Sequence, residues 1–316
     1  MTKLAVLMDP IETIEMSHDS TIAMLLAAQQ KGWELYYFQA HDLYFDRGKL
    51  LVNSQQLILS ATGERYQLVA VGSHRASDFN VILMRKDPPF NIEYIYLTYL
   101  LEQAEQEGTL IVNKPQSLRD ANEKMFTLWF SDCCAETLVS SNMEILKEFW
   151  YEQGEIILKP LDSMGGRSIF YASQNEPNIN VILETLTEFG NVHIMAQKYI
   201  PAIKTEGDKR ILLINGEPVS HTLVRMPAVN DIRGNMASGA TVKVLPLTKH
   251  EQQLCAKIGP TLRDKGLIFV GLDVIGGYIT EINVTSPTGI QELNQLANLD
   301  IASDLINNLQ ERLDEK

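Results

Sequence analysis

The stretch GLDVIGGYITEINVTSP, residues 271–287, decides the fold because it places charged side chains inside an apolar β-hairpin. Apolar residues lead into Gly276-Gly277 and follow it, as expected of two paired strands joined by a tight turn. Burying an ionised carboxylate is costly unless a partner compensates its charge. Asp273 and Glu281 therefore need a partner, and its nature indicates what the hairpin is for.

The length of the hairpin turn decides which side chains meet. Glu281 and Asn283 are two residues apart and share a face of the strand. A two-residue Gly276-Gly277 loop would pair Asp273 with Thr280, whereas a three-residue loop with a left-handed glycine pairs Asp273 with Glu281. We expect the three-residue loop, because two adjacent carboxylates and an amide are hard oxygen ligands suited to Mg²⁺. The alternative is that one carboxylate simply faces water across a sheet edge.

The length, net charge and composition of the chain argue against several classes of function. Its 316 residues allow two or three packed units, and its net charge of −13 argues against a broad nucleic-acid-binding surface. No apolar stretch approaches the ~18–20 residues that a membrane span needs. Three cysteines without a CxxC pair fit a reduced, cytoplasmic protein, and six dispersed histidines do not favour a histidine-based metal site.

The first 120 or so residues alternate strand and helix signals, which predicts a βαβ layer. The expected strands are 3–8, 34–38, 80–90 and 109–113, and the expected helices are 20–31 and 94–108. A parallel sheet binds ligands at the carboxyl ends of its strands, where Asp9-Pro10 and the loop 85–87 lie. Turn chemistry alone also explains these loops, and it is sufficient for Pro88-Pro89.

A second unit is expected to begin near Ser117, where S-L-R-D resembles a capping box opening the helix that carries Lys124. Strand signals follow at 155–161 and 211–216, and a closing helix is expected near 292–313. The polar stretch 226–241 lacks periodicity and is rich in Gly, Asn and Ala. A long loop of this kind inside a compact protein is often a lid.

The segment ILKPLDSMGGRSIF, residues 157–170, is a candidate phosphate-binding loop. Lys159 ends an apolar strand, and Gly165 and Gly166 follow in a loop whose backbone could close on phosphate oxygens. The spacing matches neither the P-loop nor the dinucleotide fingerprint. A plain hairpin turn would explain the glycine pair equally well.

Three arginines, Arg210, Arg225 and Arg233, add cationic groups whose planar fork suits carboxylates and phosphates. Each taken alone is explained by a surface ion pair. Together with Lys124, Lys159 and the acidic hairpin they indicate an ATP site. A metal there would neutralise the buried carboxylates of the hairpin.

With these residues in view, the whole chain resembles the prokaryotic type of glutathione synthetase, an ATP-grasp enzyme. The resemblance rests on MDP, VILMRKDPPF, NKPQSLRDANEK, ILKPLDSMGGRSIF, AQKYIPAI, GDKRILLINGEPV, RGNMASG, GLIFVGLDVIG and TEINVTSPTGI. It implies an α/β, ATP-grasp fold with an N-terminal βαβ (pre-ATP-grasp) domain at 1–122. The central ATP-grasp subdomain would span 123–200, and the C-terminal subdomain would span 201–316.

The resemblance also implies an activity: joining γ-glutamylcysteine to glycine with ATP and Mg²⁺ or Mn²⁺, through an acyl phosphate. Lys124, Lys159 and the loop 162–168, with Gly165 and Gly166, would hold the ATP phosphates. The adenine pocket would be lined by Gln197, Lys198, Tyr199 and Ile200. The metal ligands would be Asp273, Glu281 and Asn283. Arg210 and Arg225 would stabilise the transferring phosphoryl group, and the lid with Arg233 would exclude water, which hydrolyses acyl phosphates. A homotetramer is implied as well.

Two positions depart from the family pattern. Ser163 stands where relatives usually carry glycine, and Ala240 follows Gly239 where a glycine pair is common; both could stiffen a loop.

Two other functions remain open at this point. One is a different ATP-grasp carboxylate–amine ligase, of the D-alanine or γ-glutamyl peptide type, and the other is a non-catalytic ATP-binding protein of the same fold.

Overall fold

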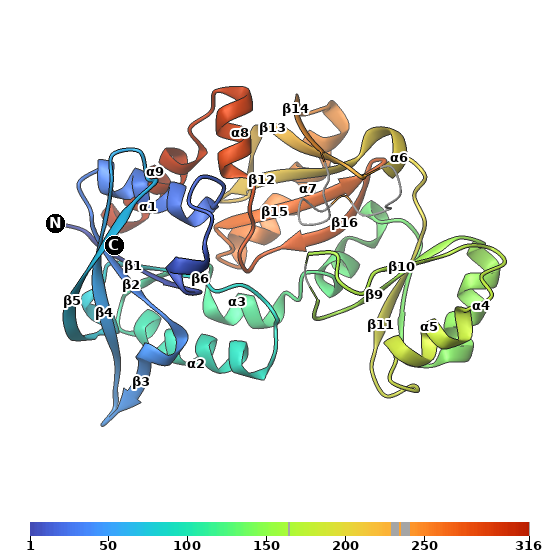
Figure 1. The fold of residues 1–316 in the computed structure, drawn as a ribbon, viewed down its shortest axis with the longest axis horizontal. Helices are drawn as coiled ribbons and strands as arrows, with labels where there is room; N and C mark the ends of the chain where they lie inside the picture. Colours follow the sequence, from blue (N-terminus) through green and yellow to red (C-terminus); the bar gives the residue numbers. More distant parts are fainter. Residues whose placement is uncertain (164, 229–233, 235–240, 316) are drawn as a thin grey trace.

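The computed structural model describes residues 1–163, 165–228, 234 and 241–315, which form three β-sheets with flanking helices (Figure 1). The predicted lid at 226–241 falls largely on residues 229–233 and 235–240, so Arg233 and Ala240 lie outside the described residues. Within the described part of the chain, no helix is long and apolar enough to cross a membrane.

The first sheet has the strand order β3-β4-β2-β1-β6-β7, with β5 paired to β4. Its strands are β1 (Lys3–Met8), β2 (Glu34–Phe38), β3 (Leu43–Asp46), β4 (Lys49–Leu59), β5 (Tyr66–Arg75), β6 (Val81–Arg85) and β7 (Leu110–Val112). β1 runs parallel to β2 and β6, and β6 runs parallel to β7, which confirms the predicted βαβ layer. The antiparallel strands β3, β4 and β5 were not predicted.

The helices of the first unit begin close to where the sequence places them. α1 (Ser20–Gln30) starts after Asp19, whose side chain accepts a hydrogen bond from the Ile22 amide at 2.9 Å, and Gly32 follows it at φ +86°. α2 (Ile92–Gln106) is capped in the same way by Asn91.

The predicted capping box at Ser117 is wrong. α3 (Pro115–Asp120) has already begun there, with Pro115 at its first position, which suits the fixed φ of proline. The Ser117 hydroxyl instead donates to the Lys265 carbonyl oxygen. Lys124 lies beyond this helix, immediately before the 3-10 helix η4 (Met125–Cys133).

The second sheet is small and antiparallel, with the order β10-β9-β11-β8. It comprises β8 (Thr137–Ser140), β9 (Ile156–Pro160), β10 (Phe170–Ala172) and β11 (Ile194–Lys198). α4 (Met143–Gln153) and α5 (Ile179–Leu186) cover one face, where Leu146, Trp150 and Leu183 pack against Ile156 and Leu158. This unit forms the right-hand end of Figure 1.

The third sheet has the order β14-β13-β12-β15-β16 and carries the quoted hairpin. Its strands are β12 (Asp208–Ile214), β13 (Glu217–Met226), β14 (Thr241–Pro246), β15 (Phe269–Ile275) and β16 (Tyr278–Asn283), and the short helix α6 (Ile203–Glu206) precedes them. One face is apolar and belongs to the same core as α7 (Lys249–Asp264). Alternation along the strands therefore turns Arg210, Asp273 and Glu281 to the other face.

The turn of the quoted hairpin differs from the expectation, although its pairing does not. Ile275 pairs with Tyr278, so Gly276-Gly277 is a two-residue turn, with φ +55° and +84°. A β-bulge then adds Thr280 to the outgoing strand, and Asp273 pairs with Glu281. The predicted three-residue loop is wrong, but the bulge produces the same juxtaposition of carboxylates.

The single closing helix expected near 292–313 is two helices, α8 (Ile290–Ala297) and α9 (Ile301–Asp314). Asn298 separates them in the left-handed conformation, at φ +53°, and the Asp300 side chain caps α9. α9 returns to the first unit and shares a core with α1 (Figure 1). The C-terminal segment therefore ties the third sheet to the first.

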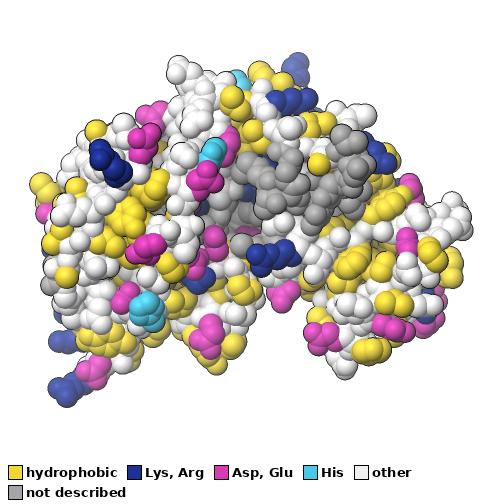
Figure 2. Space-filling view, in the orientation of Figure 1, with side chains coloured by type: hydrophobic (Ala, Val, Ile, Leu, Met, Phe, Trp, Pro, Cys, Tyr) yellow, Lys and Arg dark blue, Asp and Glu magenta, His cyan; other side chains and the backbone are white. Residues whose placement is uncertain are grey.

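The molecular surface agrees with the acidic composition. On the face drawn in Figure 2, Lys and Arg side chains are scattered among Asp and Glu side chains rather than gathered into a broad basic patch.

Candidate active site

A pocket of about 110 Å³ opens between the second and third sheets, and it collects most of the predicted site residues. All eight predicted ATP-binding residues line it: Lys124, Lys159, Gly165, Gly166, Gln197, Lys198, Tyr199 and Ile200. Asp273 and Glu281 line it too. Sequence segments more than 140 residues apart thus meet at one concave site, as ligand pockets between packed units commonly do.

Lys159 on β9 is buried against the hairpin. Its Nζ donates to Gln197 Oε1 at 2.9 Å and to the Thr280 carbonyl oxygen at 3.3 Å. The bulge at Thr280 therefore gives Lys159 an acceptor as well as setting the hairpin register. Burial lowers the pKa of Lys159 to about 8, and the charge of Glu281 offsets part of that fall.

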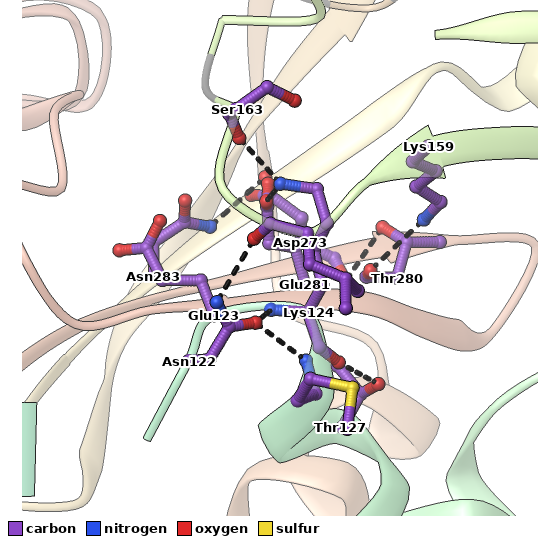
Figure 3. A network of polar contacts seen from close by, with 12 residues as sticks. Asn122, Glu123, Lys124, Thr127, Lys159, Ser163, Asp273, Thr280, Glu281 and Asn283 are labelled. Atoms are coloured by element: carbon purple, nitrogen blue, oxygen red, sulfur yellow. Dashed lines mark hydrogen bonds and ion pairs between the residues drawn. The ribbon is translucent and has the colours of Figure 1, made fainter. Parts of the chain in front are cut away.

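Lys124 compensates the second carboxylate of the hairpin. Its Nζ lies 3.0 Å from Glu281 Oε1 and donates to the Ser163 carbonyl oxygen at 2.6 Å (Figure 3). Lys124 thus links the metal-ligand candidate Glu281 to the loop that contains Gly165 and Gly166.

The partner of Asp273 is a pair of arginines. Arg210 donates to Asp273 from Nε at 2.5 Å and from Nη2 at 2.8 Å, and Arg225 Nη2 lies 3.0 Å from Asp273 Oδ1. Burial alone would raise the pKa of Asp273, but the two guanidinium groups hold it well below its usual range. In the described structure, these arginines compensate the charge that the sequence analysis assigned to a metal.

Asp208 completes this buried cluster, and the sequence analysis did not select it. It pairs with Arg225 across β12 and β13 at 2.5 Å, and burial raises the pKa of Asp208 to about 6 despite that partner. Asp208 Oδ1 and Arg225 Nε are both buried without a hydrogen-bond partner in the described part of the chain. Asp208 lies two residues before Arg210 on one strand, so the two side chains share a face, and this spacing could have identified Asp208 from the sequence.

Glu123 is a second residue that the sequence analysis missed. Its Oε1 accepts hydrogen bonds from the Val284 and Thr285 amides at 2.9 and 3.0 Å and from the Thr285 hydroxyl at 2.8 Å. The Glu123 carbonyl oxygen also accepts from the Ile282 amide. Burial and the charge of Glu281 raise the pKa of Glu123, whereas the hydrogen bonds from Thr285 lower it. Glu123 fixes the end of β16, where the candidate ligands lie.

The predicted metal ligands share one face of the hairpin. Asn283 Nδ2 donates to Asp273 Oδ2 at 3.2 Å and to the Gly271 carbonyl oxygen at 3.3 Å (Figure 3), and Asn283 Oδ1 accepts no hydrogen bond from the residues that the structure describes. Among the described residues, no group of three His, Cys, Asp or Glu side chains has metal-binding geometry. The candidate set consists instead of two carboxylates and one amide.

An apolar wall forms another part of the pocket, and the sequence analysis did not predict it. It is made by Ile157, Ile169, Ile203 and Ile275, beside Tyr199 and Ile200. Ile157 lies two residues before Lys159 on β9, so the strand presents an apolar and a cationic residue to the same side. Such a wall suits the flat apolar face of a nucleobase.

Comparisons with known proteins show which family this chain belongs to. The profile described as "Prokaryotic glutathione synthetase, ATP-grasp domain" matches residues 123–298, and "Prokaryotic glutathione synthetase, N-terminal domain" matches residues 2–119. The glutathione synthetase of Pseudomonas putida is 51% identical over 312 residues, which is 98% of both chains. The glutathione synthetase of Escherichia coli K12 is 50% identical over 317 residues, which is 100% of both.

Solved structures agree at the level of the fold. D-cycloserine synthetase DcsG superposes with a TM-score of 0.69 at 15% identity, over 98% of this chain and 99% of that one. D-alanyl-alanine synthetase A from Vibrio cholerae gives a TM-score of 0.62 at 12% identity, over 99% and 98%. These neighbours share the fold. The matched profile identifies the ATP-grasp domain, and both profiles with the full-length relatives show that the chain belongs to the prokaryotic glutathione synthetase family.

Proposed function

We propose that this chain, an ATP-dependent ligase, joins γ-glutamylcysteine to glycine and releases glutathione, ADP and phosphate. The observation that carries the proposal is the pocket in which Lys124 and Lys159 lie beside the carboxylates of the hairpin. The relatives at about 50% identity over their full length are named glutathione synthetases, so the two alternative functions are not favoured.

The chemistry requires positioning and charge stabilisation more than a protein nucleophile. The cysteinyl carboxylate of the dipeptide attacks the γ-phosphorus of ATP, forming an acyl phosphate and ADP. The amine of glycine then attacks the acyl carbon, phosphate leaves, and the nitrogen loses a proton as the amide forms. Arg210 and Arg225, which both pair with Asp273, would balance the negative charge of the transferring group.

The nucleotide would lie between the second and third sheets. Lys159 and Lys124 would bind its phosphates, and the apolar wall with Tyr199 and Ile200 would contact the base. The ammonium group of Lys124 has three N–H donors, so it can bind a phosphate oxygen while it stays beside Glu281 and the Ser163 carbonyl oxygen.

The hairpin fits a divalent metal through Glu281 and Asn283 Oδ1, which are hard donors on one face of the sheet, whereas both oxygens of the neighbouring Asp273 accept from arginine. Mg²⁺ or Mn²⁺ bound there would neutralise phosphate charge. The homotetramer implied by the resemblance and the cytoplasmic location indicated by the cysteine pattern stay predictions, and sedimentation and fractionation would test them.

The test is ADP release with ATP and Mg²⁺, adding γ-glutamylcysteine and glycine separately and then together. Release that needs both, with one glutathione formed per ADP, is the expected result. Tight ATP binding without any turnover of this pair would refute the proposed acceptors while leaving the nucleotide site in place.

A further inference from the structure

Three consecutive residues, Asn122, Glu123 and Lys124, form a short connector between α3 and η4, and their side chains reach both sides of the nucleotide pocket (Figure 3). Glu123 fixes this connector to the third sheet, because it binds the backbone at the end of β16. Lys124 lines the pocket and lies beside Glu281. The remaining side chain, that of Asn122, reaches the backbone that follows β9 in the second sheet.

The side-chain amide of Asn122 is bound to the backbone at both ends. Its Oδ1 accepts from the Lys124 amide at 3.2 Å and from the Met125 amide at 3.0 Å, and its Nδ2 donates to the Leu161 carbonyl oxygen at 3.0 Å. Since backbone amides only donate and carbonyl oxygens only accept, these partners fix the orientation of the amide group. One end of the side chain therefore caps the start of η4, and the other end ties Leu161 to it.

The Leu161 carbonyl oxygen lies where β9 passes into the candidate phosphate loop, 162–168. Lys124 Nζ donates to the Ser163 carbonyl oxygen at 2.6 Å, so two donors from the connector bind alternate carbonyl groups at the start of this loop. The cavity that Asn122, Leu161 and Ser163 help to line has a volume of about 10 Å³, which is the space of one water molecule. Asn122 therefore acts on a nucleotide through the loop and not by direct contact.

We propose that Asn122 is a positioning residue: by tying Leu161 to the connector, it holds the phosphate loop where the loop binds the β- and γ-phosphates of ATP. A loop that is already in place loses less conformational freedom when the nucleotide binds. Without the tether, only a fraction of the molecules would hold the loop in its binding position, and the apparent Kd for ATP would rise accordingly. This inference rests on the nucleotide site of the proposed function and is independent of which acceptors the enzyme joins.

Asn122→Ser removes the tether without changing the charge of the site. A serine hydroxyl can still cap η4, because serine is among the preferred N-cap residues, but it is too short to reach the Leu161 carbonyl oxygen. The Kd for ATP, measured by calorimetry at constant free Mg²⁺, should rise roughly three- to tenfold, as expected for one lost hydrogen bond. The Kd for AMP, which lacks the β- and γ-phosphates, should be unchanged. At saturating ATP, kcat should stay within about twofold, because the bound nucleotide itself holds the loop.

Limited digestion with trypsin measures the position of the loop directly, since Arg167 is an exposed residue within it. When opening is fast relative to cleavage, the cleavage rate follows the fraction of molecules in which the loop is open. Without nucleotide, cleavage after Arg167 should be roughly three- to tenfold faster in Asn122→Ser than in the wild type. Saturating ATP should remove the difference.

Asn142→Ser is the matched control. Asn142 caps α4 in the same way, because its Oδ1 accepts from the amides two and three residues ahead, at 2.9 and 3.3 Å. In the described part of the chain its Nδ2 has no acceptor, so this substitution alters a cap without removing a tether. The Kd for ATP, kcat and the cleavage rate should match the wild type. Melting temperatures check that both variants are folded.

An unchanged Kd for ATP in Asn122→Ser would overturn the inference. A parallel loss of affinity for ATP and AMP would also overturn it, because it would show a disturbed pocket instead of a released loop. A wild type that binds neither nucleotide would instead refute the nucleotide site of the proposed function.

Discussion

The affinity for ATP should fall as the pH rises through about 8, because Lys159 then loses its proton. Its pKa is lowered from the ordinary 10.5 to about 8, mainly by burial, and this gap corresponds to roughly 3 kcal/mol. Only the protonated amine attracts phosphate strongly, and a bound phosphate raises the pKa again. At pH 9 roughly one tenth of the free enzyme carries the charge, so the Kd for ATP should be about tenfold higher than at pH 7.

The lowered pKa of Lys159 also affects the free energy of unfolding, in a direction that depends on pH. The unfolded chain binds the Lys159 proton up to about pH 10.5 and the folded chain only up to about 8. Below pH 8 the buried charge of Lys159 therefore lowers the free energy of unfolding. That penalty is removed as the pH rises from about 8 to about 10.5, so the free energy of unfolding increases over this range. Bound ATP should reduce that cost, since the phosphate compensates the buried ammonium group.

Isothermal titration calorimetry of ATP at constant free Mg²⁺, from pH 7 to 9, measures the effect. Repeating it at pH 9 in buffers of different ionisation enthalpy should show uptake of close to one proton on binding. The arginine in Lys159→Arg keeps its charge from pH 7 to 9, so the Kd of this variant for ATP should be nearly constant over that range. Lys209→Arg is the matched control, because Lys209 pairs with Glu251 at 2.8 Å and does not line the pocket. A flat wild-type profile, or the same fall in Lys159→Arg, would refute the reasoning.

Three further substitutions test buried contacts, two of them in the site and one in the fold around it. Asp273→Asn leaves two buried guanidinium groups without their shared carboxylate, so the free energy of unfolding should fall by roughly 3–5 kcal/mol, and an unchanged Tm would contradict this. Glu123→Gln should lower kcat about tenfold with a smaller change in the KM for ATP, because it loosens the end of β16; a lower Tm with normal kcat would show that Glu123 is only structural. Gly259→Ala would put a Cβ 2.2 Å from the Gly216 carbonyl oxygen, so chemical denaturation should show a loss of about 1–3 kcal/mol or more, and wild-type stability would exclude the clash.

The sequence predicted the parts of the fold that depend on periodicity and local chemistry. β1, β2 and the start of α1 lie where hydrophobic runs and an N-cap aspartate place them. The hairpin strands β4 and β5 were missed, because their burial depends on packing against other elements. The capping box at Ser117 failed because Pro115 starts the helix first.

The sequence predicted which residues line the site better than it predicted which of them form ion pairs with one another. The eight ATP-binding candidates do line one pocket, but the pairing of Asp273 with Arg210 and Arg225 was not foreseen. Which cation meets which carboxylate depends on the register of β12 against β15, a long-range property that no local pattern encodes. Glu123 was missed for the same reason, since its partners lie about 160 residues away.

The bulge at Thr280 also bears on how this hairpin can change in length during evolution. In a two-residue turn without a bulge, the residue that follows Ile279 pairs with Asp273, so losing Thr280 alone would leave Glu281 opposite Asp273 and Asn283 on the same face. What the deletion would remove is the extra carbonyl oxygen that accepts from the buried Lys159. We therefore expect functional relatives that lack this residue to keep both candidate ligands but to provide another acceptor for the lysine.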